Sequence, residues 1–202
     1  MRTALDVHRA LLERGVAHEV VRLRTRVSSA DDLPSALGLG ADGGCLAVRL
    51  YAVVPPPGGL GPPDDGVAAP RWVAVLVPAG KLPDPVALLA ALDAGCVRPA
   101  TPGEVNAVTG YADGLVSPAD LPAGVEVLAD AAVGLTDVVY TAAGEGGVAL
   151  GVRTRDLLVA CGARAASLAP APVPLPEPRF ADIVDLDAVR HGAHPPGAAP
   201  AP

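Results

Sequence analysis

The chain has 202 residues, of which half are hydrophobic and only 2% are aromatic, so alanine, valine and leucine must build its core. This length is enough to bury one sizeable core. Glycine and proline contribute 23 residues each without a repeating period, which excludes a collagen-like protein and indicates proline- and glycine-rich loops and tails. The net charge of −7 argues against nucleic-acid binding over the whole surface.

The apolar runs are short and the cysteines are few. No run approaches the roughly 20 residues that a membrane-spanning helix needs, and charged residues interrupt the N-terminal segment where a signal peptide would be apolar. We therefore expect a cytoplasmic protein. Cys45, Cys96 and Cys161 lack the spacing of a zinc site or a disulfide framework, so we expect all three to be small buried hydrophobes and no metal to be bound.

Capping residues, glycines and branched apolar runs predict the elements of the first half. In chain order these are a helix from Thr3 to Gly15, a strand over 18–23, a short helix from Ser28 or Ser29 to Leu37, and strands over 45–54 and 71–77. The two longer strands should form a hairpin. Its loop, 55–70, is rich in proline and glycine, through which a strand cannot continue.

The second half alternates short helices and strands. The expected elements are helices from Asp84 to Gly95 and from Thr101 to Gly110, strands over 125–128, 138–141 and 148–152, and a last helix capped by Thr154 and ended by Gly162. Prolines at every second position then mark a tail over 170–202, which we expect to be partly disordered. The pattern predicts one α/β (α+β) domain over residues 1–169.

The common catalytic motifs are missing. The chain has no phosphate-binding loop, no dinucleotide-binding glycine motif, no HExxH and no GxSxG. The positions of its four histidines suggest no Ser–His–Asp set. If this protein is an enzyme, it does not use a conventional nucleophile, and we expect it to need no cofactor.

The most informative segment is TPGEVNAVTGYADGLVSP, at 101–118. In it, Gly114 and Pro118 bracket Leu115, Val116 and Ser117. Glycine lets a backbone approach a ligand closely, and proline fixes the shape of the loop. On its own, this G-x-x-x-P loop is more often a structural turn than a binding site.

The ordered set of segments resembles the YbaK/ProX family of aminoacyl-tRNA editing domains, which are related to the insertion domain of prolyl-tRNA synthetase. The resemblance covers about residues 3–169, and the TPxEV…TGY…G-x-VSP segment is its most specific part. The other segments that carry it are ERGVAHEVV at 13–21, SALGL at 35–39, CLAVRLYAVV at 45–54, residues 72–92, VEVLADAAV at 125–133 and residues 138–163.

This resemblance implies a mixed α/β fold around a strongly bent, largely antiparallel sheet flanked by helices. It also implies hydrolysis of the ester that joins a wrong amino acid to its tRNA, in trans to the synthetase, as a step of translation quality control. The partners would be the 3′ end of an aminoacyl-tRNA and a synthetase, with no role for DNA or a membrane. Gly114 and Gly144 would contribute backbone groups to catalysis and Ser117 would orient the loop, while Leu115, Val116 and Pro118 would face the substrate.

The chain departs from the family on the strand over 45–54. Many active relatives carry a lysine followed by serine or threonine there, and matching the motif puts Val48 at the lysine position and Arg49 at the next. A slip of one residue would turn every neighbouring side chain to the other face, although a bulge could bring Arg49 into the pocket locally. We expect Val48 and Arg49 to line the substrate site.

Charge is unevenly distributed, because residues 1–50 carry seven arginines against six acids. Arg22, Arg24 and Arg26 alternate, so on a strand they would share one face. They are either a solvated face or a patch that contacts tRNA phosphates.

Three functions stay open: a deacylase, a catalytically inactive relative that lacks the family lysine, and a hydrolase of another small ester or amide.

Overall fold

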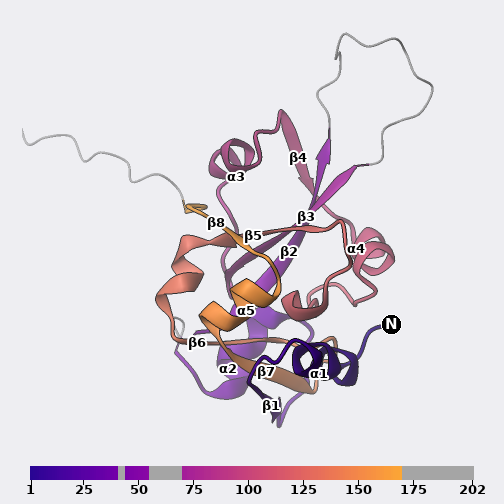
Figure 1. Ribbon diagram of the computed structural model, residues 1–202, viewed down its shortest axis with the longest axis vertical. Coiled ribbons are helices and arrows are strands. Elements are labelled where there is room, and N and C mark those ends of the chain that lie inside the picture. Colours follow the sequence, from indigo (N-terminus) through magenta and orange to yellow (C-terminus); the bar gives the residue numbers. More distant parts are fainter. Residues whose placement is uncertain (41–43, 55–69, 170–202) are drawn as a thin grey trace, which may run out of the picture. The chain divides into compact units, whose positions relative to one another are not determined.

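The computed structural model describes residues 1–40, 44–54 and 70–169, and their strands form two sheets (Figure 1). The predicted loop over 55–70, apart from its last residue, and the predicted tail lie outside these ranges. The strands are β1 (His18–Arg22), β2 (Leu46–Val54), β3 (Arg71–Pro78), β4 (Cys96–Pro99), β5 (Glu126–Asp130), β6 (Val138–Ala142), β7 (Val148–Arg153) and β8 (Arg164–Ala166).

The helices are short and lie between the strands. They are α1 (Ala4–Glu13), α2 (Leu33–Leu37), α3 (Pro85–Leu92), α4 (Pro102–Thr109) and α5 (Thr154–Ala160), with 3-10 turns η1 (Ala30–Asp32), η2 (Pro118–Asp120) and η3 (Ala131–Leu135). Among the described residues, no helix combines the length and the apolar character needed to cross a membrane.

The mixed α/β fold class predicted from the sequence is confirmed, but its strands divide between two sheets. The first has the order β1-β7-β6 and is antiparallel throughout. The second has the order β4-β2-β3-β5-β8, in which β3 pairs with β5, and β5 with β8, in parallel. The chain between β3 and β5 is long enough to cross back over the sheet, which a parallel pair requires.

Capping residues start the helices where the sequence predicts them. Thr3 and Thr101 form capping boxes with Asp6 and Glu104, and the Asp84 carboxylate accepts the N–H of Ala87 at 2.9 Å. Thr154 is a correction, because it is the first residue of α5 rather than its cap, and its buried hydroxyl has no partner among the described residues.

Two elements were missed, and one cysteine was misplaced. Strands β4 and β8 are only four and three residues long, and they pair at the two edges of the larger sheet. Cys96 begins β4 and is exposed, whereas Cys45 is buried and Cys161 is partly buried. The expectation that all three cysteines are buried is therefore wrong for Cys96, because an edge strand leaves its first residue open to solvent.

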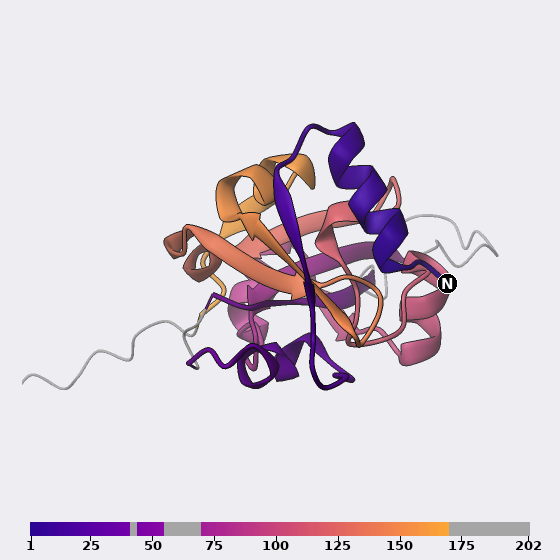
Figure 2. The same cartoon turned by 90° about the horizontal axis from the view of Figure 1, so that it is seen from below.

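The main core lies between the two sheets. The faces of β2, β3, β5 and β7 that point toward each other carry Leu46, Leu76 and Leu150, and α1 and α5 add Leu11 and Leu157. Figure 2 shows α1 and α5 on one side of the three-stranded sheet and α2 on the other. Two smaller clusters fill the outer faces, one under α2 and one under α3.

The β2–β3 hairpin keeps a continuous register from Leu46 opposite Pro78 to Val53 opposite Arg71, with no bulge. Successive side chains of a strand point to opposite faces. Val48 therefore points into the core between the sheets, and Arg49 points to the outer face. The local bulge that would have brought both residues to one pocket is absent from the hairpin.

The turn after β1 packs closely against the turn before β7. Val27 donates its N–H to the Gly146 carbonyl at 2.8 Å, and a Cβ at Gly146 would overlap the Val27 carbonyl oxygen. We expect Gly146→Ala to lower the free energy of unfolding by about 1–3 kcal/mol, because overpacking against backbone forces the chain to shift. Urea unfolding followed by circular dichroism measures this change.

Gly147→Ala is the matched control. The nearest atom to a Cβ at Gly147 is the flexible end of Arg26, at 3.7 Å. Its stability should change by no more than about 0.5 kcal/mol. Equal losses in the two variants would contradict the close packing of this turn.

Candidate functional site

The loop 114–118 rests on the turn that precedes η1. Gly114 has a φ of +77°, and a Cβ there would lie 2.9 Å from the Ser28 carbonyl oxygen and 3.2 Å from the Ser29 Cα. Its carbonyl accepts the N–H of Ala30 at 2.8 Å, and its N–H donates to the Asp113 carboxylate at 3.0 Å. Glycine is required at 114 by both the backbone conformation and the close approach.

Gly144 ties the other end of the site to this loop. Its φ is +84°, and a Cβ there would meet the Arg2 carbonyl oxygen at 2.8 Å and the Tyr111 ring at 3.0 Å. The Gly144 N–H donates to the Leu115 carbonyl at 3.0 Å. The structure thus brings Gly114 and Gly144 to the same loop, but both of their N–H groups already have protein acceptors.

Two other N–H groups of the loop have no such acceptor. Leu115 donates to the Ala112 carbonyl at 3.1 Å, but within the described ranges Val116 and Ser117 donate to no protein group. Val116, Ser117 and Pro118 are buried, and the Ser117 hydroxyl has no hydrogen-bond partner there. The loop therefore carries two adjacent backbone donors that are not used by the fold.

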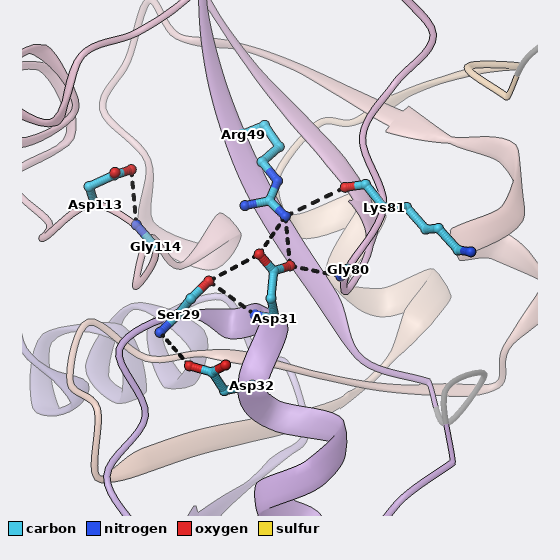
Figure 3. A network of polar contacts seen from close by, with 8 residues as sticks. All are labelled: Ser29, Asp31, Asp32, Arg49, Gly80, Lys81, Asp113 and Gly114. Carbon is cyan, nitrogen blue, oxygen red and sulfur yellow. Dashed lines mark hydrogen bonds and ion pairs between the residues drawn. The ribbon is translucent and has the colours of Figure 1, made fainter.

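Arg49 reaches the same turn from β2. Its Nη2 donates to both carboxylate oxygens of Asp31, at 2.6 and 2.7 Å, and Asp31 also accepts the N–H of Gly80 at 2.7 Å. The Ser29 hydroxyl donates to the same carboxylate at 3.2 Å. Figure 3 shows these groups beside the turn that carries Gly114, with the Lys81 ammonium directed away from them.

The electrostatics of this pair favour a charged Asp31. Burial alone would raise the pKa of Asp31, but the hydrogen bonds from Arg49 and Gly80 outweigh burial and hold the pKa below its ordinary value. Arg49 keeps further donors, since its Nε is buried without a partner in the described part of the chain. The guanidinium donates to Asp31 through Nη2 alone, so it keeps donors that the fold does not use.

The remaining predicted residues do not all gather at this point. Val48 is 6% exposed and packs in the main core, in the same cluster as Val116, whereas Leu115 packs in the outer cluster under α2. The sequence predicts that Val48 and Arg49 line one pocket. In the structure, the alternation of side chains along β2 puts them on opposite faces. Arg49, Gly114 and Leu115 lie on one side, and Val48 and Val116 lie behind them.

The three predicted tRNA-contacting arginines are exposed. Arg22 is the last residue of β1, and Arg24 and Arg26 follow it in the turn that leads to Ser28. None of the three forms an ion pair within the described residues. They do not share a strand face, because β1 ends at Arg22, and Arg26 comes two residues before Ser28, whose carbonyl faces Gly114.

A separate cavity of about 570 Å³ opens where β2 begins and where β3 and β5 end. It is lined by Lys81 and Asp130, among mostly apolar residues, and by none of the loop residues 114–118. In the ranges that the structure covers, no three His, Cys, Asp or Glu side chains gather as a metal site would require.

Sequence reasoning missed Asp31, which pairs with Arg49, and it missed Ser29 and Gly80, which donate to the Asp31 carboxylate. The only signal was the S-S-A-D-D stretch at 28–32, which predicts a helix cap and gives no indication that its first carboxylate accepts an arginine. The turn after β3 takes part in the same contact, because the Gly80 N–H donates to this carboxylate.

The comparisons with known proteins agree with the resemblance predicted from the sequence. The family model of the aminoacyl-tRNA editing domain matches residues 67–159. No curated protein matches the chain. The matched segment contains the loop 114–118 and Gly144, and Val48, Arg49 and the three arginines lie before it.

Solved structures share the fold. The crystal structure of a candidate trans-editing enzyme for prolyl tRNA synthetase matches with a TM-score of 0.67 and 23% identity, covering 83% of this chain and 97% of that one. Hypothetical protein APE2540 matches with a TM-score of 0.65 and 22% identity, covering 81% of this chain and 99% of that one. A scaffold for epitope grafting matches with a TM-score of 0.65 and 23% identity, covering 83% of this chain and 97% of that one.

The Arg49–Asp31 pair makes a testable prediction about stability and pH. We expect Arg49→Met to lower the free energy of unfolding at neutral pH by about 1–2 kcal/mol. Because the folded-state pKa of Asp31 is lowered, the pair stabilises the fold above the ordinary pKa of an aspartate, near 4. That stabilisation is lost as the pH falls through the lower folded-state pKa, so the difference between wild type and variant should shrink there.

Urea unfolding at neutral pH and in steps down to about pH 3 measures this difference. Arg155→Met is the control, because the Arg155 side chain is 79% exposed and pairs only with its neighbour Asp156. A difference between wild type and Arg49→Met that stays constant with pH would contradict the role of Asp31.

Proposed function

We propose that this chain is a trans-acting aminoacyl-tRNA deacylase, which hydrolyses the ester between a wrong amino acid and its tRNA. The observation that carries the proposal is the match of the aminoacyl-tRNA editing domain to residues 67–159. That segment holds the loop 114–118 together with Gly144, whose N–H fixes the loop. The shared fold of the candidate trans-editing enzyme supports it.

The reaction needs little from side chains, since an aminoacyl ester is already activated. A site can accelerate its hydrolysis by positioning the ester and by stabilising the oxyanion that forms on its carbonyl. Val116 and Ser117 are 3% and 0% exposed, so in this proposal their unused N–H groups donate to that oxygen once substrate binding opens the loop. Gly114 and Gly144 act by holding the backbone of the loop in position.

In this proposal, the substrate itself helps to activate the attacking water. The resemblance to the editing family implies that the free ribose hydroxyl beside the ester helps to activate this water. Arg49 cannot accept the proton, because a guanidinium stays charged, but it pairs with Asp31 through Nη2 alone, and its remaining donors can hold a substrate oxygen. Val48, with the loop residues Val116 and Pro118, forms the buried back of the site, and Leu115 lies on its outer side.

The acidic surface restricts how tRNA binds. With a net charge of −7, the protein holds tRNA only locally, through the exposed Arg22, Arg24 and Arg26, or receives it from a synthetase. These arginines lead directly into the turn under Gly114, so phosphates held there lie beside the proposed site. The proposal includes a cytoplasmic location, where aminoacyl-tRNAs are made and used.

A second candidate is a catalytically inactive relative that keeps a binding role. The observation that favours it is the burial of Val48 in the core, at the position where many active relatives carry lysine. The two functions differ in one result, the release of amino acid from mischarged tRNA.

The direct test is the loss of labelled amino acid from a panel of mischarged tRNAs, beginning with proline tRNAs that carry alanine, cysteine or serine. We expect release well above the spontaneous rate for at least one pair. Gly114→Ala should reduce it by about 100-fold, because its Cβ would push the loop away from the Ser28 carbonyl. Gly103→Ala in α4, where a Cβ meets nothing within 4 Å, is the control that should keep full activity.

The inactive alternative makes the opposite prediction. If folded protein releases no amino acid from any pair, even with the matching synthetase added, the deacylase proposal fails and a binding role remains. Circular dichroism of each variant shows whether the fold is retained, so that a lost activity is assigned to the loop.

The arginine patch has its own prediction. Replacing Arg22, Arg24 and Arg26 together by Gln should weaken tRNA binding and reduce the slope of log affinity against log salt by about 2, if each arginine neutralises one phosphate. Filter binding over a salt series measures both. The control replaces Arg153 and Arg155 by Gln, and an equal change of slope in the control would contradict a local tRNA site.

A further inference from the structure

The cavity at the ends of β2, β3 and β5 is separate from the proposed deacylase site. Its volume of about 570 Å³ lies in the range of small-molecule sites. Its walls are mostly apolar and include Leu46, Val77, Val133 and Val139. An apolar cavity of this size that opens at the surface is suited to a ligand with an apolar body.

Two opposite charges line the same cavity. Lys81 is the only lysine of the chain, it is exposed, and its ammonium has no hydrogen bond or ion pair within the described residues. Figure 3 shows this ammonium directed away from the Arg49–Asp31 pair, so it is not part of that network. No other lysine or arginine of the described chain lines the cavity.

Asp130 supplies the negative charge. It ends β5, is 7% exposed, and caps η3 by accepting the N–H of Ala132 on Oδ1 at 2.7 Å. That hydrogen bond uses one carboxylate oxygen, and the other has no donor among the described residues. A carboxylate lining an apolar cavity with one oxygen unused can accept hydrogen bonds from a ligand ammonium.

The other polar groups of the cavity do not suggest nucleophilic chemistry. Burial raises the pKa of the Cys45 thiol to about 11, so it is protonated near neutral pH. The Thr136 hydroxyl donates to the Val133 carbonyl at 3.4 Å. The lining therefore fits a binding site better than a second catalytic centre.

We propose that this cavity binds a free α-amino acid with a large apolar side chain. Asp130 holds the ligand ammonium, Lys81 holds its carboxylate, and the apolar walls take its side chain. One acid, one base and an apolar body are the three features of such a zwitterion, and the cavity offers a partner for each. The inference does not depend on the proposed deacylase activity, because no residue of the loop 114–118 lines the cavity.

Isothermal titration calorimetry of the full chain tests this assignment with three ligands. L-Phenylalanine should bind with a Kd below about 1 mM. Phenylalaninamide lacks the carboxylate and N-acetylphenylalanine lacks the ammonium, so each should bind about tenfold or more weakly, as expected for the loss of one charged hydrogen bond. L-Leucine replaces phenylalanine in a parallel titration.

Two variants assign each charge to its residue. Lys81→Met should weaken the binding of phenylalanine about tenfold. The binding of phenylalaninamide should not change, since the amide has no carboxylate for Lys81 to hold. Asp130→Asn keeps an oxygen that can cap η3, so the fold is retained, and it should remove the preference for a free ammonium. Arg155→Met removes a positive charge outside the cavity and is the matched control.

The variant Ala132→Trp fills the cavity from its exposed rim and should abolish binding. Two results would overturn the proposal. One is no binding of either amino acid at millimolar concentration by the folded wild type. The other is equal binding of phenylalanine, its amide and its N-acetyl form, which would indicate an apolar cavity that does not recognise the two charges.

Discussion

The Asp31 carboxylate joins three parts of the chain that are far apart in sequence. It accepts hydrogen bonds from Arg49 on β2, from the Gly80 N–H in the turn after β3, and from Ser29 in its own turn. The same turn carries the backbone on which Gly114 rests. Because a charged acceptor strengthens each of these bonds, the turn under the loop 114–118 is held most firmly while this carboxylate is ionised.

Arg49 has a structural role in this arrangement, because it holds the Asp31 carboxylate. Strand alternation sends Val48 into the core and Arg49 to the outer face, and the unbroken hairpin register prevents both from reaching one pocket. On its inner side the candidate site is closed by the apolar core residues Val48 and Val116, and on its outer side the Arg49 guanidinium lies beside the turn that supports the loop. The deacylase that we propose would use such a site for positioning and for backbone donors, which suits an ester that is already activated.

Local signals were enough to predict most of the fold. Thr3, Thr101 and Asp84 cap helices where their patterns predict them, and the branched runs at 45–54 and 71–77 form the expected hairpin. The short strands β4 and β8 could not be found this way, because three or four residues carry no clear period and their pairing comes from the sheet edge. The division into two sheets likewise depends on long-range pairing.

The candidate site was predictable only in part. The loop 114–118 and Gly144 were found from the glycine and proline pattern and the resemblance, and the structure brings them into contact. Which N–H groups of the loop are left without an acceptor depends on the tertiary fold, and no sequence pattern records it. The cavity with Lys81 and Asp130 was missed for the same reason, because its walls come from the ends of separate strands.

The central claim is that the buried N–H groups of Val116 and Ser117, together with Arg49, become donors to an aminoacyl ester when it binds at the loop 114–118. The most direct measurement is a ¹⁵N NMR titration of the chain with a non-hydrolysable 3′-aminoacyl-adenosine analogue. We expect the largest shifts at the backbone amides of Val116 and Ser117 and at Nε of Arg49. Shifts confined to residues outside this loop, with these three unmoved at saturation, would contradict the account.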